Sequence, residues 1–197
     1  KISSIVHYHN SYFVGFLMDG ILLLEKQKET NHYQIQSLPI NSGVFCLKKD
    51  RFQDVVWIGT DGQGVYLYSN PLYSIKSMVL SNYTEKIERP VRAIYLDDER
   101  TFWVGTKGNG ILKIYDYEFD KNISDCRAEV LTTSNSALSS NAVYCFAKSH
   151  RNLLWIGDEE GLTYYSYREK RIKSIPIRIG NEDFKYIHDI YETADSE

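Results

Sequence analysis

One arrangement of hydrophobic and polar residues occurs four times along the chain. In each copy an apolar run reaches an aromatic residue and then a glycine, a polar turn with a second glycine follows, and another apolar run comes next. The clearest copies are VVWIGTDGQGVYLYS at 55–69, TFWVGTKGNGILKIYD at 101–116 and LLWIGDEEGLTYYSY at 153–167, and YFVGFLMDGILLLEK at 12–26 is weaker. Short apolar runs separated by glycine turns predict β-strands joined by tight hairpins.

The spacing of the copies predicts the architecture. The motif glycines Gly15, Gly59, Gly105 and Gly157 are 44, 46 and 52 residues apart. A period of about 40 to 50 residues is typical of the four-stranded blade of a β-propeller. All three tryptophans of the chain occupy one motif position, at Trp57, Trp103 and Trp155, and Phe13 takes it in the first copy.

Each repeat divides into four β-prone runs, and we found no convincing helical periodicity. The expected strands are 2–7, 13–16, 21–25 and 33–38; 44–49, 55–60, 65–68 and 75–80; 91–96, 101–106, 111–115 and 128–132; and 143–148, 153–157, 162–167 and 172–177. We therefore predict an all-β fold, a β-propeller fragment of four four-stranded blades plus the first strand of a fifth. The single domain covers 1–197, with blades at about 1–40, 41–82, 88–133 and 139–178 and the extra strand at 184–193. Because that strand is surplus to a ring of four, we expect a piece of a larger propeller.

The motif residues have a structural explanation in this architecture. Blade sheets pack face to face, so Trp57 can fill the gap between two blades. Gly59 lies on the same strand face two residues later, and its missing side chain leaves room for a large neighbour. Asp61, Gly62 and Gly64 suit a tight hairpin. A phosphate-binding loop is disfavoured because the P-loop lysine and serine are absent and a strand follows.

Composition excludes several classes of function. The 197 residues are 43% hydrophobic and 14% aromatic, as in a globular protein. A net charge of −3 gives no footprint for nucleic acid or an anionic membrane, and no apolar run approaches the roughly 20 residues that span a bilayer. Cys46 and Cys145 share a repeat position that Ala93 takes in another repeat, which predicts a small buried slot rather than a disulfide. No Cys/His set has zinc-ligand spacing, so we expect neither metal nor cofactor.

The same residues carry a family resemblance. Trp-Ile-Gly-Thr, a short turn, glycine and an apolar run ending near Tyr-Asp or Tyr-Ser resemble the two-component regulator propeller repeat. LSSNAV at 138–143 is similar to the L-S-x-N-x-V of that family, and VRAIYLD at 91–97 is similar to its V-x-x-I-x-x-D. The resemblance implies a periplasmic sensor region of a hybrid two-component histidine kinase, of the Bacteroides type. It further implies a non-catalytic module that senses an oligosaccharide and passes the signal across the membrane.

The candidate ligand-binding residues come from loops that share one face of a propeller. In the usual geometry, the turn between the second and third strands of a blade lies beside the connection into the next blade. We predict ligand contacts from Asp61, Gln63, Lys107, Asn109, Asp158, Glu159, Arg89, Asn141, Tyr83 and Tyr186. No catalytic residue is predicted, because the five histidines share no repeat position and no nucleophile has an identifiable base.

The predicted partners and the alternatives follow from these features. We expect an oligosaccharide ligand, and either the remainder of the propeller or a second copy in a homodimer, because an open blade face is apolar. We expect no nucleic acid and no membrane contact by this segment. The alternatives are a propeller-based carbohydrate-active lyase or hydrolase, or a protein-interaction scaffold, since a fold alone does not assign a function.

Overall fold

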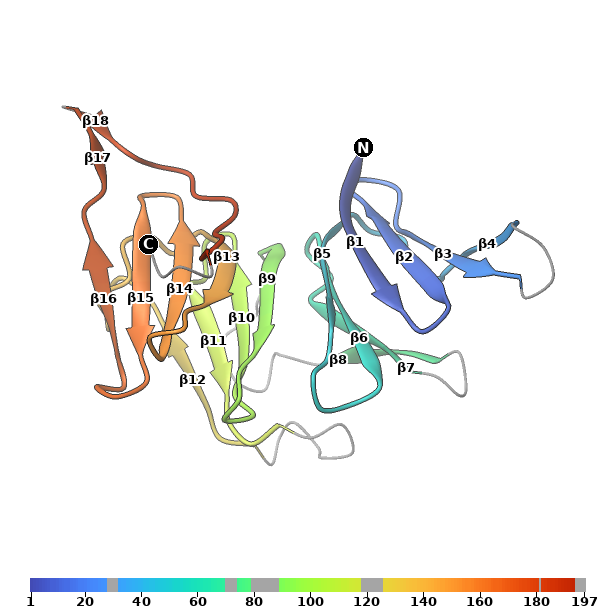
Figure 1. Ribbon diagram of the computed structural model, residues 1–197, viewed down its shortest axis with the longest axis horizontal. Coiled ribbons are helices and arrows are strands. Elements are labelled where there is room, and N and C mark those ends of the chain that lie inside the picture. The colour runs from blue at the N-terminus through green and yellow to red at the C-terminus, as the bar shows by residue number, and fades with distance from the viewer. Residues whose placement is uncertain (28–31, 70–73, 79–88, 118–125, 181, 194–197) are drawn as a thin grey trace.

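The computed structural model describes residues 1–27, 32–69, 74–78, 89–117, 126–180 and 182–193. Within these ranges every regular element is a β-strand, and none is a helix that could cross a membrane. Four of the sheets are four-stranded and antiparallel, and each is formed by strands that follow one another in the chain (Figure 1). The predicted all-β architecture of four blades is therefore confirmed.

The blades are named in chain order. Blade 1 contains β1 (Ile2–Tyr8), β2 (Ser11–Phe16), β3 (Ile21–Lys26) and β4 (Tyr33–Ser37). Blade 2 contains β5 (Val44–Lys49), β6 (Val55–Thr60), β7 (Val65–Ser69) and β8 (Ser74–Met78). Blade 3 contains β9 (Val91–Leu96), β10 (Phe102–Thr106), β11 (Ile111–Ile114) and β12 (Ala128–Leu131). Blade 4 contains β13 (Val143–Lys148), β14 (Leu153–Asp158), β15 (Leu162–Ser166) and β16 (Arg171–Ile175).

The blades pack side by side around a common centre. The first strand of each blade is the inner one, and β1, β5, β9 and β13 contact one another in succession. These inner strands lie in the middle of Figure 1, and the outer strands β4 and β16 lie toward its two sides. Three hydrophobic clusters fill the three spaces between consecutive blades. The core is thus divided among blade interfaces, as expected when both faces of a sheet are covered.

The aromatic residue of the repeated motif fills each of these spaces. Trp57 is fully buried, and its ring centroid lies 4.5 Å from that of Phe102 on the next blade. Trp103 does the same toward blade 4, 4.8 Å from the ring of Tyr165. Trp155 is only half-buried and packs against Tyr164 of its own sheet. The predicted role of Trp57 between two blades is confirmed.

Two buried aspartates hold the tryptophans from the turn between the first two strands. Asp50 accepts hydrogen bonds from the backbone N–H groups of Phe52 and Gln53 and, at 2.8 Å, from the indole N–H of Trp57. Asp97 accepts the indole N–H of Trp103 at 2.9 Å. Each carboxylate is therefore fully used inside the fold, which explains why an acid can be buried there.

The motif glycine lies where the next blade approaches most closely. A Cβ on Gly59 would lie 3.0 Å from Cγ1 of Val91, the first residue of the next inner strand. Cβ atoms on Gly15 and Gly105 would meet Cγ1 of Val44 and Val143 at 2.7 and 2.8 Å. The prediction that Gly59 makes room for a large neighbour is confirmed.

The cysteine slot faces these glycines across the sheet. Cys46 pairs with Gly59 and Cys145 with Gly157, and Ala93 takes the equivalent place opposite Gly105. Both thiols are free, and burial raises the pKa of Cys46 to about 12. The expectation that these cysteines form no disulfide is confirmed, and the slot is buried at Ala93 and half-buried at the two cysteines.

The C-terminal part differs from the expectation in detail. Ile187 lies against Gly157, in the place that Val44, Val91 and Val143 take at the other interfaces. The segment 184–193 therefore lies where the first strand of a fifth blade is expected. No strand among the described residues pairs with it. A strand ladder needs hydrogen bonds to a neighbour, so this segment stays single. The small hairpin of β17 (Arg178–Ile179) and β18 (Glu182–Asp183) was not predicted.

Candidate functional site

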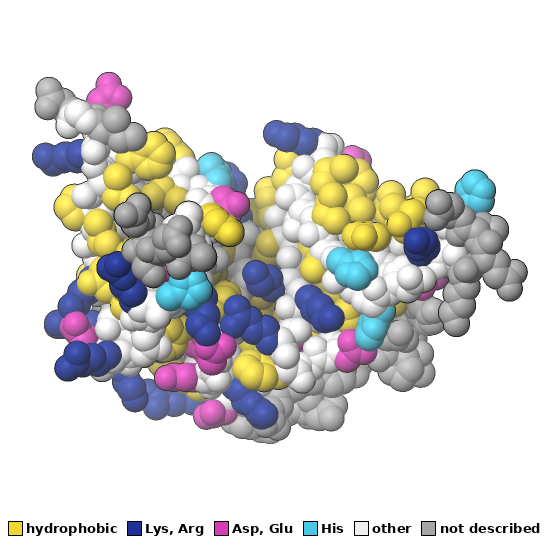
Figure 2. Space-filling model, viewed as in Figure 1, with side chains coloured by type: hydrophobic (Ala, Val, Ile, Leu, Met, Phe, Trp, Pro, Cys, Tyr) yellow, Lys and Arg dark blue, Asp and Glu magenta, His cyan; other side chains and the backbone are white. Residues whose placement is uncertain are grey.

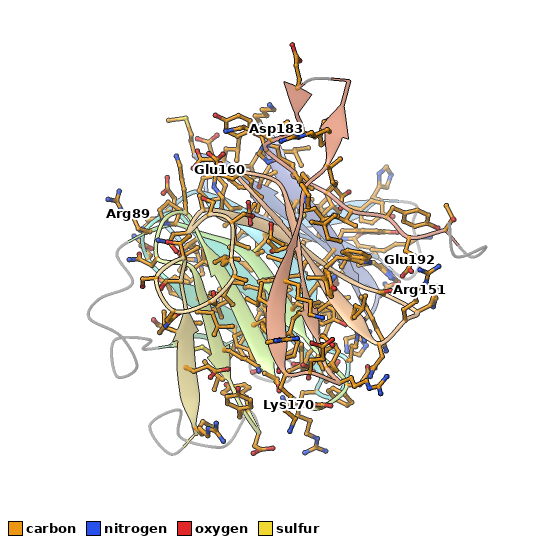
Figure 3. The ribbon with its side chains drawn as sticks, turned by 90° about the vertical axis from the view of Figure 1, so that its left-hand side faces the viewer. Arg89, Arg151, Glu160, Lys170, Asp183 and Glu192 are labelled. Atoms are coloured by element: carbon orange, nitrogen blue, oxygen red, sulfur yellow. The ribbon has the colours of Figure 1, made fainter. Side chains whose placement is uncertain are left out.

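The hairpin turns and the connections into the next blade meet at one end of the molecule, which we call the rim. The N–H groups of Gly108 and Gly110 in the blade 3 turn both donate to the carbonyl of Asn141, at 2.9 Å, in the connection into blade 4. The N–H of Tyr186 donates to the carbonyl of Glu159 in the blade 4 turn at 3.0 Å. Figure 3 shows Arg89 and Glu160 at this end and Lys170 at the opposite one. The predicted sharing of one face by these two kinds of loop is confirmed.

Several predicted site residues present their side chains to solvent at the rim. The exposed ones are Asp61, Gln63, Arg89, Lys107 and Tyr186, and the half-buried ones are Asn109, Asn141 and Glu159. Tyr83 lies outside the described residues. Nothing in these positions alone assigns a ligand, so their role in binding stays a prediction.

The two predicted asparagines differ in what they still offer. Asn141 uses its side-chain oxygen to accept the N–H of Thr133 at 2.9 Å, so its role in the fold is structural. The side-chain oxygen of Asn109 is buried without a hydrogen-bond partner among the described residues. A buried acceptor without a partner is unfavourable, so Asn109 is the better candidate to contact a donor.

Asp158 requires a correction. It was predicted on a solvated loop, but it is fully buried at the end of β14. One carboxylate oxygen accepts the N–H groups of Glu160 and Gly161 at 2.9 and 3.0 Å, and the other accepts the hydroxyl of Ser139 at 2.6 Å. Burial raises the pKa of Asp158 despite these bonds. The residue stabilises the short turn of blade 4 and is not accessible to a ligand.

The inner strands carry a feature that sequence reasoning missed. In blade 2, Val44 pairs with Thr60 and Cys46 with Gly59, so Phe45 between them is an extra, unpaired residue. The same irregularity occurs at Ser3, Arg92 and Tyr144 in the other blades. Such β-bulges bend a strand and redirect a side chain, and they are common at barrel rims and beside active sites.

Four side chains at this level form a continuous row, which we call the mouth row: Phe45, Arg92, Tyr144 and His188. The Cζ atom of Arg92 lies 5.3 Å from the ring centroid of Phe45 and 4.7 Å from that of Tyr144. The rings of Tyr144 and His188 stack with centroids 4.5 Å apart and an interplanar angle of 26°. Because three members come from consecutive inner strands, the row lines the central side of the blades just inside the rim.

The row can make both polar and apolar contacts. Its members contact one another through their faces, so their edges remain available to a ligand. Phe45, Arg92 and Tyr144 are half-buried, and His188 is exposed. Burial raises the pKa of the Tyr144 hydroxyl, which keeps it protonated as a donor. The sequence signal was the residue after the first buried valine of each inner strand, but it differs in every repeat.

A cavity lies on the outer side, between blades 3 and 4. It measures about 740 Å³ and is lined by residues that include Glu129, Tyr165 and Arg171. Beside two of its lining residues, the buried amine of Lys113 donates to the hydroxyl of Tyr165 at 3.0 Å and lies 3.4 Å from Glu129. Rings of Trp103, Tyr115 and Tyr165 enclose this amine within 4.7 Å of their centroids.

The Lys113 cluster is part of the blade interface rather than a reaction centre. Lys113 pairs with Trp103 in the sheet, and Leu67 takes that position opposite Trp57. The lysine therefore fills space that a leucine fills in blade 2, with its charge neutralised by Glu129. No group of three residues that could hold a metal ion occurs in the described parts of the chain.

Comparisons with known proteins agree with the fold. No family model matches the chain. The extracellular domain of BT3049 from B. thetaiotaomicron, a proposed hybrid two component system, superimposes with a TM-score of 0.69 at 23% identity over 93% of this chain and 22% of that one. This chain shares the fold of that domain. The extracellular domain of BT4673 from the same organism, described as a one component or a hybrid two component system, gives a TM-score of 0.65 at 20% identity, over 89% of this chain and 22% of that one.

These likenesses establish the propeller blades and no more. The chain spans about a fifth of each of those two solved chains, and the identities are below a quarter. A curated relative, translation initiation factor 6 of Saccharolobus solfataricus, is 31% identical over 140 residues, which is 64% of this chain and 57% of that factor. Because the chain spans less than two thirds of that factor, this similarity does not assign the chain to its family.

Proposed function

We propose that this chain is a non-catalytic ligand-binding part of the extracytoplasmic sensor region of a two-component system. Its proposed location is the periplasm, and its proposed ligand is an oligosaccharide. The observation that carries the proposal is the mouth row, which places ring edges and hydrogen-bond donors inside a polar rim. Aromatic side chains with a few fixed polar groups are the usual lining of a small-ligand site. The extracellular domains of similar fold support the proposed location.

Such a module would signal through its arrangement rather than by chemistry. The ligand would bridge mouth-row residues from several blades and so favour one arrangement of the blades, or of a dimer, over another. It can shift that equilibrium only by its difference in affinity for the two arrangements. A second copy of this chain is the proposed partner, because large hydrophobic side chains are exposed on blade 1, among them Ile2, Ile5 and Ile35.

The test is a thermal-shift screen of the 197-residue chain against neutral and acidic oligosaccharides, with each mixture analysed for products after overnight incubation. We expect at least one intact oligosaccharide to raise the melting temperature. The shift should fall sharply in Tyr144→Ala and persist in Tyr33→Ala, a matched change on the outer strand of blade 1. An oligosaccharide that is consumed would contradict the non-catalytic assignment and favour a lyase or hydrolase. A shift that Tyr144→Ala leaves unchanged would contradict the location of the site.

A further inference from the structure

The centre of the mouth row is Arg92, a cation for which the described residues supply no carboxylate partner. The guanidinium of Arg92 lies between the rings of Phe45 and Tyr144, and its Nε atom is buried without a hydrogen-bond partner. Among the described residues no carboxylate forms an ion pair with Arg92. Other arginines of the chain do have such partners: Arg51 lies 3.0 Å from Asp98, and Arg178 lies 3.0 Å from Asp183.

This environment leaves one kind of contact open. Two aromatic rings lie near the guanidinium. The N–H donors of an arginine lie in the plane of its guanidinium, where they can bind a planar anion. A buried donor without an acceptor is costly, and a planar pair of oxygens can accept two of these donors at once. The position is therefore prepared for an anionic group that approaches along the row.

Two further cations lie at the same end of blade 3. Arg89 packs beside the turn at Gly108, and the N–H of Lys107 in that turn donates to the carbonyl of Pro90 at 2.9 Å. Both lie beside the start of β9, and Arg92 is the second residue of that strand. Lysine and arginine side chains also lie across the middle of the face that carries the inner strands, with aspartate and glutamate side chains beside them (Figure 2). Arg89 and Lys107 at this end of blade 3 add to the attraction of Arg92 for an anionic ligand.

We propose that the mouth row binds an acidic saccharide and that Arg92 receives its carboxylate or sulfate group. The inference rests on the proposed function, because it names the class of oligosaccharide that the rim accepts. Burial raises the pKa of the Tyr144 hydroxyl, and the nearby carboxylate of Glu159 on the neighbouring rim turn raises it further, so this hydroxyl remains a donor to the ligand. The anionic group forms no covalent bond, so the saccharide leaves unchanged.

The test measures binding by calorimetry with three probes: tetragalacturonate, its methyl ester and a sulfated galactan disaccharide. The variants are Arg92→Gln and Arg92→Lys, with Arg171→Gln on the outer strand of blade 4 as the matched loss of one charge. We expect tetragalacturonate or the sulfated disaccharide to bind the native chain. Arg92→Gln should weaken that binding by about tenfold or more, because a charge-assisted bidentate contact is lost. Arg92→Lys should lie in between, and Arg171→Gln should bind as the native chain does.

The outcomes separate this inference from the proposed function. Weak binding of the methyl ester, with strong binding of the acid, supports the contact to a carboxylate, and strong binding of the sulfated probe supports a sulfate. Binding of the methyl ester that equals that of the acid, or binding that Arg92→Gln leaves unchanged, overturns the inference while the proposed oligosaccharide site stands. Failure of both acidic probes to bind the native chain overturns the inference, and the neutral compounds of the thermal-shift screen then decide the proposed function. Melting curves of both Arg92 variants establish that they are folded.

Discussion

The close contact between blades 3 and 4 at Gly105 gives a quantitative test of the packing. A Cβ on Gly105 would lie 2.8 Å from Cγ1 of Val143, 3.1 Å from Cβ of Ala93 and 3.2 Å from Cε2 of Phe146. Carbon atoms in contact ordinarily lie about 3.5–4.0 Å apart, so Gly105→Ala forces several atoms to move. Overpacking of this kind costs about 1–3 kcal/mol. Alanine also lowers the conformational entropy of the unfolded chain, which offsets about 0.4–1 kcal/mol of this loss of stability. We therefore expect a net loss of about 1–2 kcal/mol in the free energy of unfolding.

A double-mutant cycle identifies Val143 as the obstacle. Val143→Ala alone removes two buried methyl groups and should cost about 2 kcal/mol. In the double variant the new Cβ of residue 105 occupies part of the space that Val143 leaves. The double variant should then be more stable than the sum of the two losses predicts, by about 1 kcal/mol or more. Urea unfolding followed by tryptophan fluorescence measures all four proteins.

The control pairs Gly105→Ala with Val44→Ala. Val44 occupies the equivalent place opposite Gly15, at the interface of blades 1 and 2. These two changes share no neighbour, so their losses should add within about 0.5 kcal/mol. Additive losses in the Gly105–Val143 pair as well would refute the close approach of blades 3 and 4.

Further predictions concern buried polar groups. Asp50→Ala should lower the free energy of unfolding by about 2–3 kcal/mol in urea unfolding, because the Trp57 indole and two backbone N–H groups lose their acceptor. Cys46 should resist iodoacetamide at pH 8 in the folded protein and react after denaturation, because burial raises its pKa to about 12; mass spectrometry of the alkylated peptide measures this. Burial also raises the pKa of Asp158, so its stabilising contribution is present below its unfolded pKa and is lost as the pH rises through the folded one. Asp158→Asn should therefore gain stability relative to the native chain as the pH rises above about 4, near the ordinary pKa of an aspartate, and melting temperatures that change in parallel with pH would contradict this.

The strands could be predicted because the same pattern of apolar residues and glycines occurs in every repeat. The alternation of apolar residues around Trp57, Trp103 and Trp155 fixes which residues face a neighbouring blade, and glycines mark the turns. The observed strands agree with the predicted ones to within one or two residues at each end. The segment 184–193 lies where the extra strand was expected, but it forms no strand ladder within the described residues, because pairing depends on a neighbouring strand and not on local sequence alone.

The site was harder to predict for two physical reasons. A β-bulge is a property of the register between two strands, so the sequence of β9 alone does not show that Arg92 turns away from its sheet. The stacking of Arg92 with Phe45 and Tyr144 depends on the packing of three blades. The prediction that Asp158 contacts a ligand was wrong. A polar residue in a turn was expected in solvent, but its carboxylate accepts three hydrogen bonds within the fold.

Hydrogen exchange with mass spectrometry tests the location of the site most directly. The 197-residue chain is compared with and without an oligosaccharide that raises its melting temperature. The account predicts slower exchange in peptides that cover the bulges and the last member of the mouth row, at 43–46, 90–93, 142–145 and 185–188. Protection confined to 129–137 and 170–174, which line the outer cavity between blades 3 and 4, would place the ligand elsewhere and contradict the account.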